Sequence, residues 1–278
     1  MSALLRSLLF ALFEIVITIV FAILALLCFP LPARARYRII TTWSRLIVAG
    51  ARTICGIRYR VLGAENVPPP PFIVLAKHQS AWESLVFQAI FPPQVWVVKR
   101  EVLWIPFFGW GLALLSPIAI DRRAGSRALN KLLEQGRERL ARGLCIVIFP
   151  EGTRVKPGHR GKYRAGGAWL AVKTGTTVLP VAHNAGELWP RNAFIKRPGL
   201  VTVSIGAPID ARRFTPDALN GKVEDWIENE VRRINQPDQS ERSATWLNAT
   251  CSTCSSPLIR PIGFTRPRVC SRPAPAPA

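Results

Sequence analysis

The stretch FIVLAKHQSAWES, residues 72–84, joins an apolar run to a polar turn and the start of a helical pattern. FIVLA has the length and the β-branched content of a buried strand. Ser80 and Glu83 then have the S-x-x-E spacing of a capping box, with Ser80 at the N-cap and Glu83 at N3, which marks the first turn of a helix. The stretch therefore predicts a strand that leads directly into a helix, with His78 between them.

His78 and Glu83 admit two interpretations. A carboxylate that accepts the proton of one ring nitrogen leaves the other nitrogen free as a base, as in a catalytic triad without its serine. Such a dyad needs an external hydroxyl as nucleophile, and the chain has no G-x-S-x-G elbow. Residues five apart on one helix point about 140° apart, so the dyad requires His78 to lie in the loop. In the structural alternative, Glu83 serves only the capping box.

Around this junction, β-branched runs alternate with longer helical patterns. Strands are predicted at 57–62, 72–76, 95–98, 117–120, 144–149, 177–182 and 201–205. Helices are predicted at 127–141, 165–173 and 217–234. The alternation indicates an α/β domain around a largely buried sheet.

The N-terminal segment is apolar enough to enter a membrane. Residues 8–29 are apolar apart from Glu14 and Thr18, and about 20 such residues suffice to cross a bilayer. A cleaved signal peptide is the competing interpretation, although its apolar core is normally about 7–15 residues long. A run of arginines without acidic residues follows, whereas Arg6 alone precedes the segment, so the positive-inside rule places the following domain in the cytoplasm. The arginines are Arg34, Arg36, Arg38, Arg45, Arg52, Arg58 and Arg60.

These patterns predict four segments. We expect a membrane anchor helix at 1–33, an interfacial amphipathic helix at 34–56, an α/β domain at 57–236 and a tail at 237–278. In the second segment, one apolar face alternates with arginines, which is typical of a helix at an anionic membrane surface; an ordinary core helix is the alternative. This face holds Ile39, Ile40, Trp43, Leu46, Ile47 and Ile54. The basic tail is rich in Pro and Ser, so we expect it to be disordered.

Charge and cysteine content narrow the classes of partner. The formal net charge of +20 favours anionic partners: acidic membrane lipid, phosphorylated substrates, an acidic carrier protein or nucleic acid. Six cysteines do not form a disulfide framework in a cytoplasmic chain. Cys251 and Cys254 form one CxxC pair, but no second pair or nearby histidine completes a zinc site.

A second cluster, FPEGTR at 149–154, follows the strand-like run CIVIF. Functional sites in α/β sheets favour the carboxyl ends of strands, and Arg154 there has the fork that grips phosphate. A tight turn with an incidental surface arginine is the alternative. A third stretch, residues 98–123, surrounds aromatic residues with cations, which suits a substrate with a phosphate head and a fatty tail. Ordinary core aromatics with surface basic residues are the alternative there.

Four segments in this order resemble the motifs of the 1-acyl-sn-glycerol-3-phosphate acyltransferases of the PlsC type. They are KHQSAWE, KREVLWIPFFG with IDR, FPEGTR and VLPVAHN, and the resemblance covers residues 58–208 and the placement of the anchor. It implies a mixed, largely parallel sheet flanked by helices, with an N-terminal membrane helix or helical hairpin. The family usually has Asp where this chain has Glu83, which leaves the hydrogen-bond geometry and the capping role open.

By this resemblance, residues 57–236 are the catalytic domain of an acyltransferase. His78 takes the proton from the sn-2 hydroxyl of lysophosphatidic acid, which attacks an acyl thioester, and Glu83 orients His78. The substrate phosphate is assigned to Arg154, Lys99, Arg100 and Arg122; the pocket to Glu151, Gly152 and Thr153; and the acyl channel or a membrane contact to Trp104, Phe107, Phe108 and Trp110. Acyl carrier protein or CoA thioester is the co-substrate, and no metal, bound cofactor or nucleic acid is implied.

The expected location is the inner membrane, with the catalytic domain on the cytoplasmic face and anionic lipids as partners. Two alternatives to this function are kept. In the first, the chain is an acyltransferase whose acceptor is another lysophospholipid, a lyso-aminolipid or glycerol 3-phosphate. In the second, the chain is a basic membrane or lipid-binding protein without catalysis.

Overall fold

The computed structural model describes residues 2–121 and 124–236, in which short strands alternate with helices. The helices are α1 (Ala3–Leu27), α2 (Ala33–Thr53), α3 (Trp82–Ile90), α4 (Phe108–Ala113), α5 (Ser126–Ala141), α6 (Gly166–Thr174), α7 (Ala185–Leu188) and α8 (Pro216–Asn235). The strands are β1 (Ile57–Leu62), β2 (Ile73–Ala76), β3 (Gln94–Lys99), β4 (Ile118–Ile120), β5 (Cys145–Ile148), β6 (Val178–His183) and β7 (Gly199–Ile205). Every strand and helix predicted between 57 and 236 is present, although α4 and α7 were not predicted. The tail and Arg122 lie outside the described residues.

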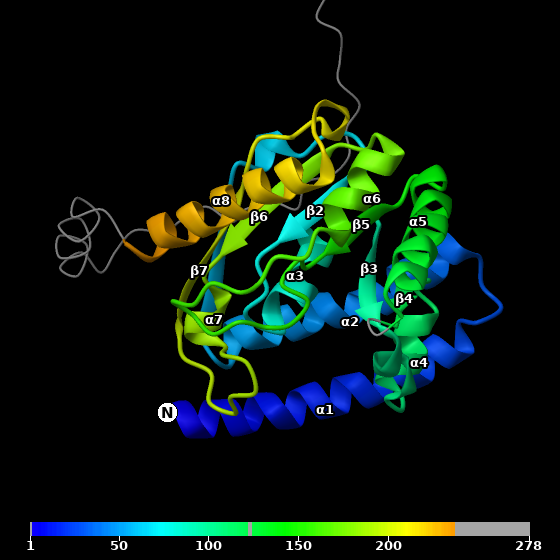
Figure 1. Ribbon diagram of the computed structural model, residues 1–278. Coiled ribbons are helices and arrows are strands. Elements are labelled where there is room, and N and C mark those ends of the chain that lie inside the picture. The colour runs from blue at the N-terminus through cyan, green and yellow to red at the C-terminus, as the bar shows by residue number, and fades with distance from the viewer. Residues whose placement is uncertain (1, 122–123, 237–278) are drawn as a thin grey trace, which may run out of the picture. The chain divides into compact units, whose positions relative to one another are not determined.

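The strands form one sheet in the order β1-β7-β6-β2-β5-β3-β4 (Figure 1). Neighbouring strands are parallel except β6 and β7, which are antiparallel. The expected mixed, largely parallel sheet flanked by helices is therefore confirmed. The central strand β2 lies between β6 and β5, so the carboxyl ends of these three strands meet at one edge of the sheet. That edge carries both His78 and the FPEGTR segment.

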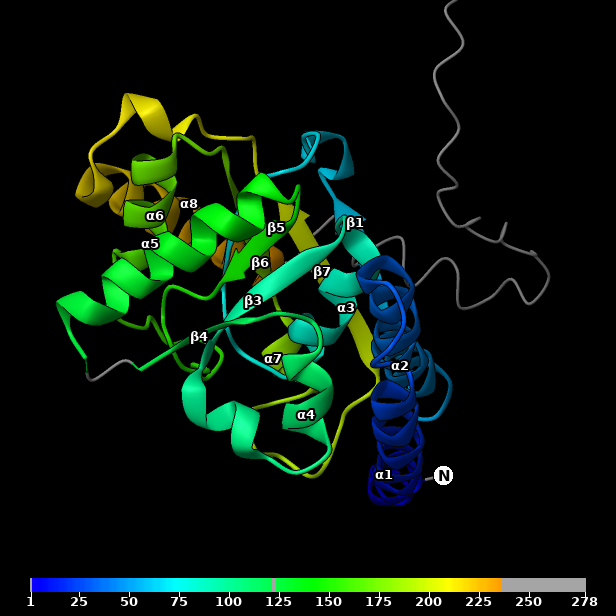
Figure 2. The ribbon, with the colours of Figure 1, turned by 90° about the vertical axis from the view of Figure 1, so that its right-hand side faces the viewer.

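Helices cover both faces of the sheet. Figure 2 shows α5, α6 and α8 on one side, and α1, α2 and α3 on the other. Successive residues of β2 alternate between the two apolar cores: Val74 and Ala76 pack on the α2 and α3 side, and Ile73 and Leu75 pack on the α6 and α8 side. This alternation follows from the two-residue period of a strand. Side chains that immediately follow β2 consequently point to different faces of the sheet.

Helices α1 and α2 form an antiparallel hairpin. Nε1 of Trp43 donates a hydrogen bond to the hydroxyl of Thr18 at 3.1 Å, and Gly50 packs against the ring of Phe13. A Cβ at Gly50 would lie 2.4 Å from that ring, so glycine permits the close approach of the two helices.

The apolar face of α2 is partly buried by the protein. Ile40 and Ile47 lie in the core that α2 shares with α1 and α3, together with Val48 and Ala51. Leu46 of the same face is 37% exposed. The core-helix alternative therefore accounts for Ile40 and Ile47, and the interfacial helix at 34–56 stays a prediction.

Helix α1 exposes the apolar surface instead. Its 25 residues are long and apolar enough to cross a membrane, by length and composition. Ser7, Phe10, Ala22 and Ala25 are buried against the rest of the protein. Most of its other large apolar side chains are exposed: Leu4, Leu5, Leu8, Leu9, Leu12, Ile15, Val16, Ile19, Val20, Ile23, Leu24, Leu26 and Leu27. An exposed apolar surface of this size marks a contact with a membrane or a partner.

Candidate functional site

His78 lies in the loop between β2 and α3, where its imidazole contacts Glu83. Nδ1 of His78 is 2.8 Å from Oε1 of Glu83, and the ring stacks on Phe149 with centroids 4.0 Å apart. The carboxylate accepts a hydrogen bond, so Nδ1 carries the proton and Nε2 is the nitrogen with a free lone pair. The side chain of His78 is 15% exposed, whereas that of Glu83 is fully buried. The geometry is that of an oriented general base.

Glu83 also holds the loop backbone. Its Oε1 accepts hydrogen bonds from the N–H groups of Gln79 at 2.9 Å and Ser80 at 2.8 Å. Burial alone would raise the pKa of Glu83, but the hydrogen bonds that the carboxylate accepts from His78 and from the Ser80 N–H hold it below its usual value. The carboxylate is therefore ionised, and one oxygen serves both the imidazole and the start of the helix.

The predicted capping box is only half formed. Glu83 accepts the Ser80 N–H, as in a capping box, but the Ser80 hydroxyl accepts from the N–H of Trp82 at 3.1 Å rather than from that of Glu83. Helix α3 begins at Trp82 with Ala81 as its N-cap, so Glu83 is the second helical residue. The later start of the helix leaves His78, Gln79 and Ser80 in the loop.

A cavity of about 740 Å³ opens beside His78. Its polar lining includes Lys99 from the end of β3 and Thr153 and Arg154 from the loop after β5. Its apolar lining comes from α1, α2 and the α4 region, and includes Phe21, Ala22, Ile40, Trp43, Phe107 and Phe108. His78, three cations with Arg191 among them, and a long apolar wall thus meet in one cavity, as suits an anionic amphiphile.

The structure separates the other predicted residues into two groups. Gly152 and Phe107 join the cavity lining. Arg100 does not line it; its guanidinium is 3.8 Å from Asp121 and lies over the ring of Trp104. Trp104 and Trp110 are also absent from the lining and are 64% and 45% exposed, so the membrane-contact alternative is the one open to them.

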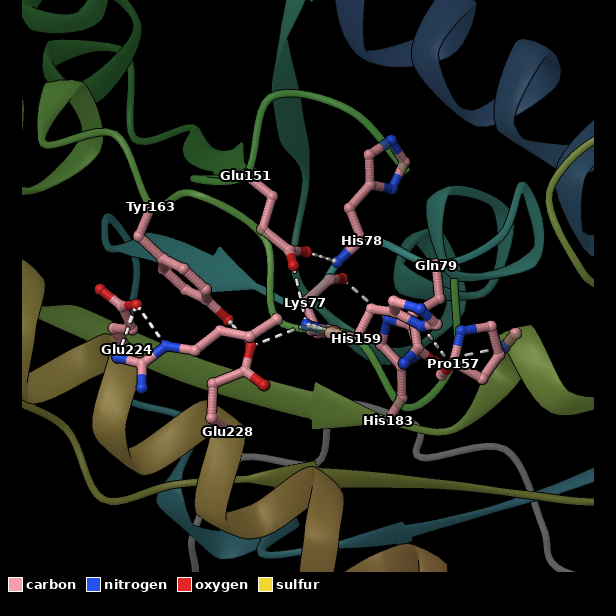
Figure 3. A network of polar contacts seen from close by, with 12 residues as sticks. Lys77, His78, Gln79, Glu151, Pro157, His159, Tyr163, His183, Glu224 and Glu228 are labelled. Atoms are coloured by element: carbon pink, nitrogen blue, oxygen red, sulfur yellow. Dashed lines mark hydrogen bonds and ion pairs between the residues drawn. The ribbon is translucent and has the colours of Figure 1, made fainter. Parts of the chain in front are cut away.

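Glu151 requires a correction, because it does not line the cavity. Its Oε1 is 2.7 Å from Nζ of Lys77, and its Oε2 accepts the backbone N–H of His78 at 2.8 Å (Figure 3). Burial raises the pKa of Glu151 above its usual value, and the ammonium of Lys77 opposes that rise. Lys77 is itself fully buried and also contacts Glu228 of α8 at 2.7 Å. Glu151 therefore holds the backbone of His78 instead of shaping the pocket.

His183, at the end of β6, is a neutral structural histidine. Burial lowers its pKa, and its Nε2 lies 2.8 Å from the carbonyl oxygen of Lys77. Nδ1 accepts the N–H of Ala185 at 3.3 Å, so the proton is on Nε2. This histidine fixes the residue that precedes His78.

Sequence reasoning missed several residues of this region. The sequence contains one indication of Lys77, because a charged residue there directly continues a buried strand. No nearby residue in the sequence indicated Glu228 as its partner. Arg191 and Asn192 also line the cavity, and Arg191 donates a hydrogen bond to the carbonyl of Arg154 at 3.0 Å. No motif marks that loop.

Within residues 2–121 and 124–236, no three His, Cys, Asp or Glu side chains group as metal ligands. The CxxC pair of Cys251 and Cys254 lies outside this part of the chain.

Comparisons with known proteins agree with the geometry. The Acyltransferase family model matches residues 58–184. A 1-acyl-sn-glycerol-3-phosphate acyltransferase of Pseudomonas aeruginosa is 46% identical over 213 residues, which are 75% of this chain and 83% of that protein. The alpha form of this enzyme from Mus musculus is 30% identical over 62% of each chain. The crystal structure of the lysophosphatidic acid acyltransferase PlsC from Thermotoga maritima superposes with a TM-score of 0.71 at 25% identity, over 85% of this chain and 99% of that one.

Proposed function

Because this chain belongs to the 1-acyl-sn-glycerol-3-phosphate acyltransferase family, we propose that it transfers a fatty acyl group from a carrier-protein or CoA thioester to the sn-2 hydroxyl of lysophosphatidic acid, giving phosphatidic acid. The observation that carries this proposal is the 2.8 Å contact of His78 with Glu83 beside a cavity that has cationic and apolar walls.

In this reaction His78 is the general base. Nε2 takes the proton of the sn-2 hydroxyl as that oxygen attacks the thioester carbonyl, and the resulting tetrahedral intermediate carries the negative charge on the former carbonyl oxygen. When the intermediate collapses, the carbon–sulfur bond breaks and Nε2–H returns the proton to the thiolate. Glu83 stabilises the imidazolium between these two steps. No acyl-enzyme forms, so both substrates occupy the site together.

The acceptor phosphate is assigned to Arg154 and Lys99, because both line the cavity with His78. A guanidinium binds phosphate through two parallel hydrogen bonds, and an ammonium adds a second positive charge. Lys99 is 3.5 Å from Glu101, an exposed pair that is easily exchanged for a phosphate. Arg100 lies outside the cavity and is not part of this proposal.

The fatty chain and the membrane are assigned to the apolar wall and to α1. Helix α1 packs on the domain from its second turn to its last: Ser7 accepts the N–H of Lys196, Phe10 contacts Trp189 edge to face, and Ala25 lies beside Gly111. A helix held along its whole length cannot cross a bilayer without drawing the polar domain into it. We therefore place α1 along one leaflet of the inner membrane, with the domain on the cytoplasmic face.

A second hollow of about 600 Å³ offers a path from that leaflet. It lies between α1 and the loop that holds Asn192 and Phe194, and it shares Glu14, Thr18, Phe107 and Asn192 with the main cavity. The acceptor and the product are both membrane lipids, so we assign this hollow to their exchange.

The acyl donor is assigned by charge to anionic thioesters. The loop from Arg154 to Arg164 carries Lys156, Arg160 and Lys162 as well, and of these cations Arg160 pairs with Glu224 at 2.7 Å. An acidic carrier protein and the phosphates of CoA are both attracted to such a loop. Both donors therefore belong in the assay.

The experiment that tests this function is transfer of a labelled acyl chain from each donor to lysophosphatidic acid, lysophosphatidylethanolamine and glycerol 3-phosphate. We expect lysophosphatidic acid to react fastest and the His78→Ala variant to lose roughly 10²-fold or more in kcat. The control is His159→Ala, an exposed histidine whose side chain is absent from the cavity lining. Near-normal turnover by His78→Ala contradicts the mechanism, and faster transfer to another acceptor contradicts the substrate.

A further inference from the structure

Lys77 and His78 are consecutive residues whose side chains serve opposite faces of the sheet. The alternation of β2 continues past Ala76, so Lys77 follows Ile73 and Leu75 toward α8, whereas His78 faces the cavity. On the α8 side the ammonium of Lys77 is fully buried between two carboxylates, Glu151 and Glu228, each 2.7 Å away. Figure 3 shows this bridge between the backbone of His78 and helix α8.

The bridge is connected directly to His78. One oxygen of Glu151 binds the ammonium of Lys77, and the other accepts the backbone N–H of His78 at 2.8 Å. On the far side, Oε1 of Glu228 binds the same ammonium and also accepts the hydroxyl of Tyr163 at 2.8 Å. A continuous chain of charged groups therefore runs from α8 to the backbone of His78.

We propose that Glu228, acting through Lys77 and Glu151, is a positioning residue for His78. The family model matches residues 58–184, and helix α8 begins later, at Pro216. This assignment therefore lies outside the matched segment. The inference rests on the proposed role of His78 as base. Glu228 touches neither substrate nor cavity; its effect on the reaction is entirely through the placement of His78.

The physical reason is that both the ring and the backbone nitrogen of His78 are held by carboxylates, in addition to the stacking of the ring on Phe149 and the hydrogen bond from Val155 N–H to the His78 carbonyl. Glu83 fixes Nδ1 of the ring, and Glu151 fixes the backbone nitrogen, so the two contacts together set the direction of Nε2. The ammonium has a third acceptor, the carbonyl of His159 at 3.3 Å, but only the two carboxylates balance its charge. Loss of the Glu228 charge therefore leaves the buried ammonium unbalanced and displaces Lys77 and Glu151 together. A displacement of about 1 Å at a catalytic group lowers the rate by up to about 10²-fold.

Helix α8 offers a matched control. Glu230, two residues from Glu228, also joins α8 to the sheet, because it accepts the hydroxyl of Ser204 on β7. It contacts neither Lys77 nor Glu151 in the described contacts. Glu230→Gln therefore weakens the attachment of α8 without touching the segment that carries His78.

The experiment compares Glu228→Gln with Glu230→Gln in the full chain. We expect Glu228→Gln to lower kcat about tenfold while the KM for lysophosphatidic acid changes less than about twofold, because the cavity cations lie on the other face. Glu230→Gln is expected to change both constants less than twofold. Glu228→Gln is expected to unfold at a lower temperature than Glu230→Gln, because it leaves the buried ammonium of Lys77 with one carboxylate, so both variants are assayed well below their thermal midpoints. Equal kcat in the two variants overturns the proposal.

A double-mutant cycle with His78→Ala separates positioning from general damage. If Glu228 acts through His78, Glu228→Gln lowers kcat in the wild-type background and leaves the residual activity of His78→Ala unchanged. Equal losses in both backgrounds overturn the proposal. If Glu228→Gln does not fold, Tyr163→Phe takes its place in the same cycle. This substitution removes one hydrogen bond from Glu228, and we expect it to lower kcat about threefold.

The two hypotheses fail in different ways. Near-normal turnover by His78→Ala contradicts the proposed function, and this inference with it. A large loss in His78→Ala without a specific loss in Glu228→Gln contradicts this inference alone.

Discussion

Nδ1 of His78 and Oε1 of Glu83 lie 2.8 Å apart, although the family to which the chain belongs usually has the shorter aspartate at position 83. The glutamate reaches back from the first turn of α3 to a loop residue, and the same oxygen accepts the N–H groups of Gln79 and Ser80. The extra methylene is thus used to span the distance from the helix to the ring. The imidazole contact and the start of the helix depend on one carboxylate.

Glu83→Gln tests whether this carboxylate acts by its charge. The amide oxygen of Gln can still accept the N–H groups of Gln79 and Ser80, so α3 is expected to form normally. The imidazolium of the reaction loses its counter-charge, and we expect kcat to fall roughly 10²-fold at similar KM. Steady-state kinetics with lysophosphatidic acid measures this, with exposed Glu187→Gln as control. Unchanged kcat in Glu83→Gln would leave capping as the role of Glu83.

Glu83→Asp tests the length of the arm. The shorter side chain cannot keep the contacts to the Ser80 N–H and to Nδ1 of His78 at their present distances without a shift of α3. We expect kcat to fall about tenfold, since the charge stays but the ring is less well oriented. A variant as active as the wild type would show that α3 moves to accommodate aspartate.

Arg154→Ala tests recognition of the acceptor phosphate. A hydrogen bond to a charged group contributes about 1.5–3 kcal/mol, so we expect kcat/KM for lysophosphatidic acid to fall about 10- to 100-fold. Transfer to monoacylglycerol, which has no phosphate, is expected to change less than about twofold. Arg127→Ala on α5, an exposed arginine absent from the cavity lining and outside the basic loop, is the control. Equal losses with both acceptors would count against the assignment of Arg154.

The burial of His183 leads us to expect that the stability of the fold depends on pH. Burial lowers the pKa of this histidine in the folded chain below the unfolded value of about 6.5, so between these two values the unfolded chain binds more protons. The free energy of unfolding should therefore fall as the pH drops below about 6.5, by up to about 1.4 kcal/mol per pH unit from this group. Urea unfolding of the wild type and His183→Gln between pH 7.5 and 5 measures it. The same slope in both proteins would refute the assignment.

The exposed face of α1 predicts how the protein binds membranes. Leu12 and Ile23 are 61% and 51% exposed and line neither hollow. Each leucine or isoleucine buried in lipid contributes about 1.5–3 kcal/mol, so Leu12→Glu with Ile23→Glu should weaken binding to phosphatidic acid vesicles at least tenfold in co-sedimentation. Leu129→Glu, which changes an exposed apolar residue of α5, should not alter binding. Unchanged binding of the double variant would show that α1 is not the contact.

Local patterns in the sequence predicted much of this protein. The strand of residues 72–76, the loop histidine and the position of FPEGTR after β5 all depend on the order of apolar and polar residues within a few positions, and such order is set by backbone geometry. The resemblance of the motifs then indicated an acyltransferase, which the comparisons confirmed.

Tertiary structure alone decided which face each side chain serves. Glu151 was expected in the pocket, and the pairing of β5 with β2 instead placed it under the backbone of His78. Glu228 is 151 residues from Lys77 in the chain, and no short-range pattern connects them. Ile40 and Ile47 of α2 fitted a membrane as well as a core in the sequence, and α1 and α3 bury them in the folded chain. Hydrophobicity determines that a face is buried, whereas the packing of distant segments determines what buries it.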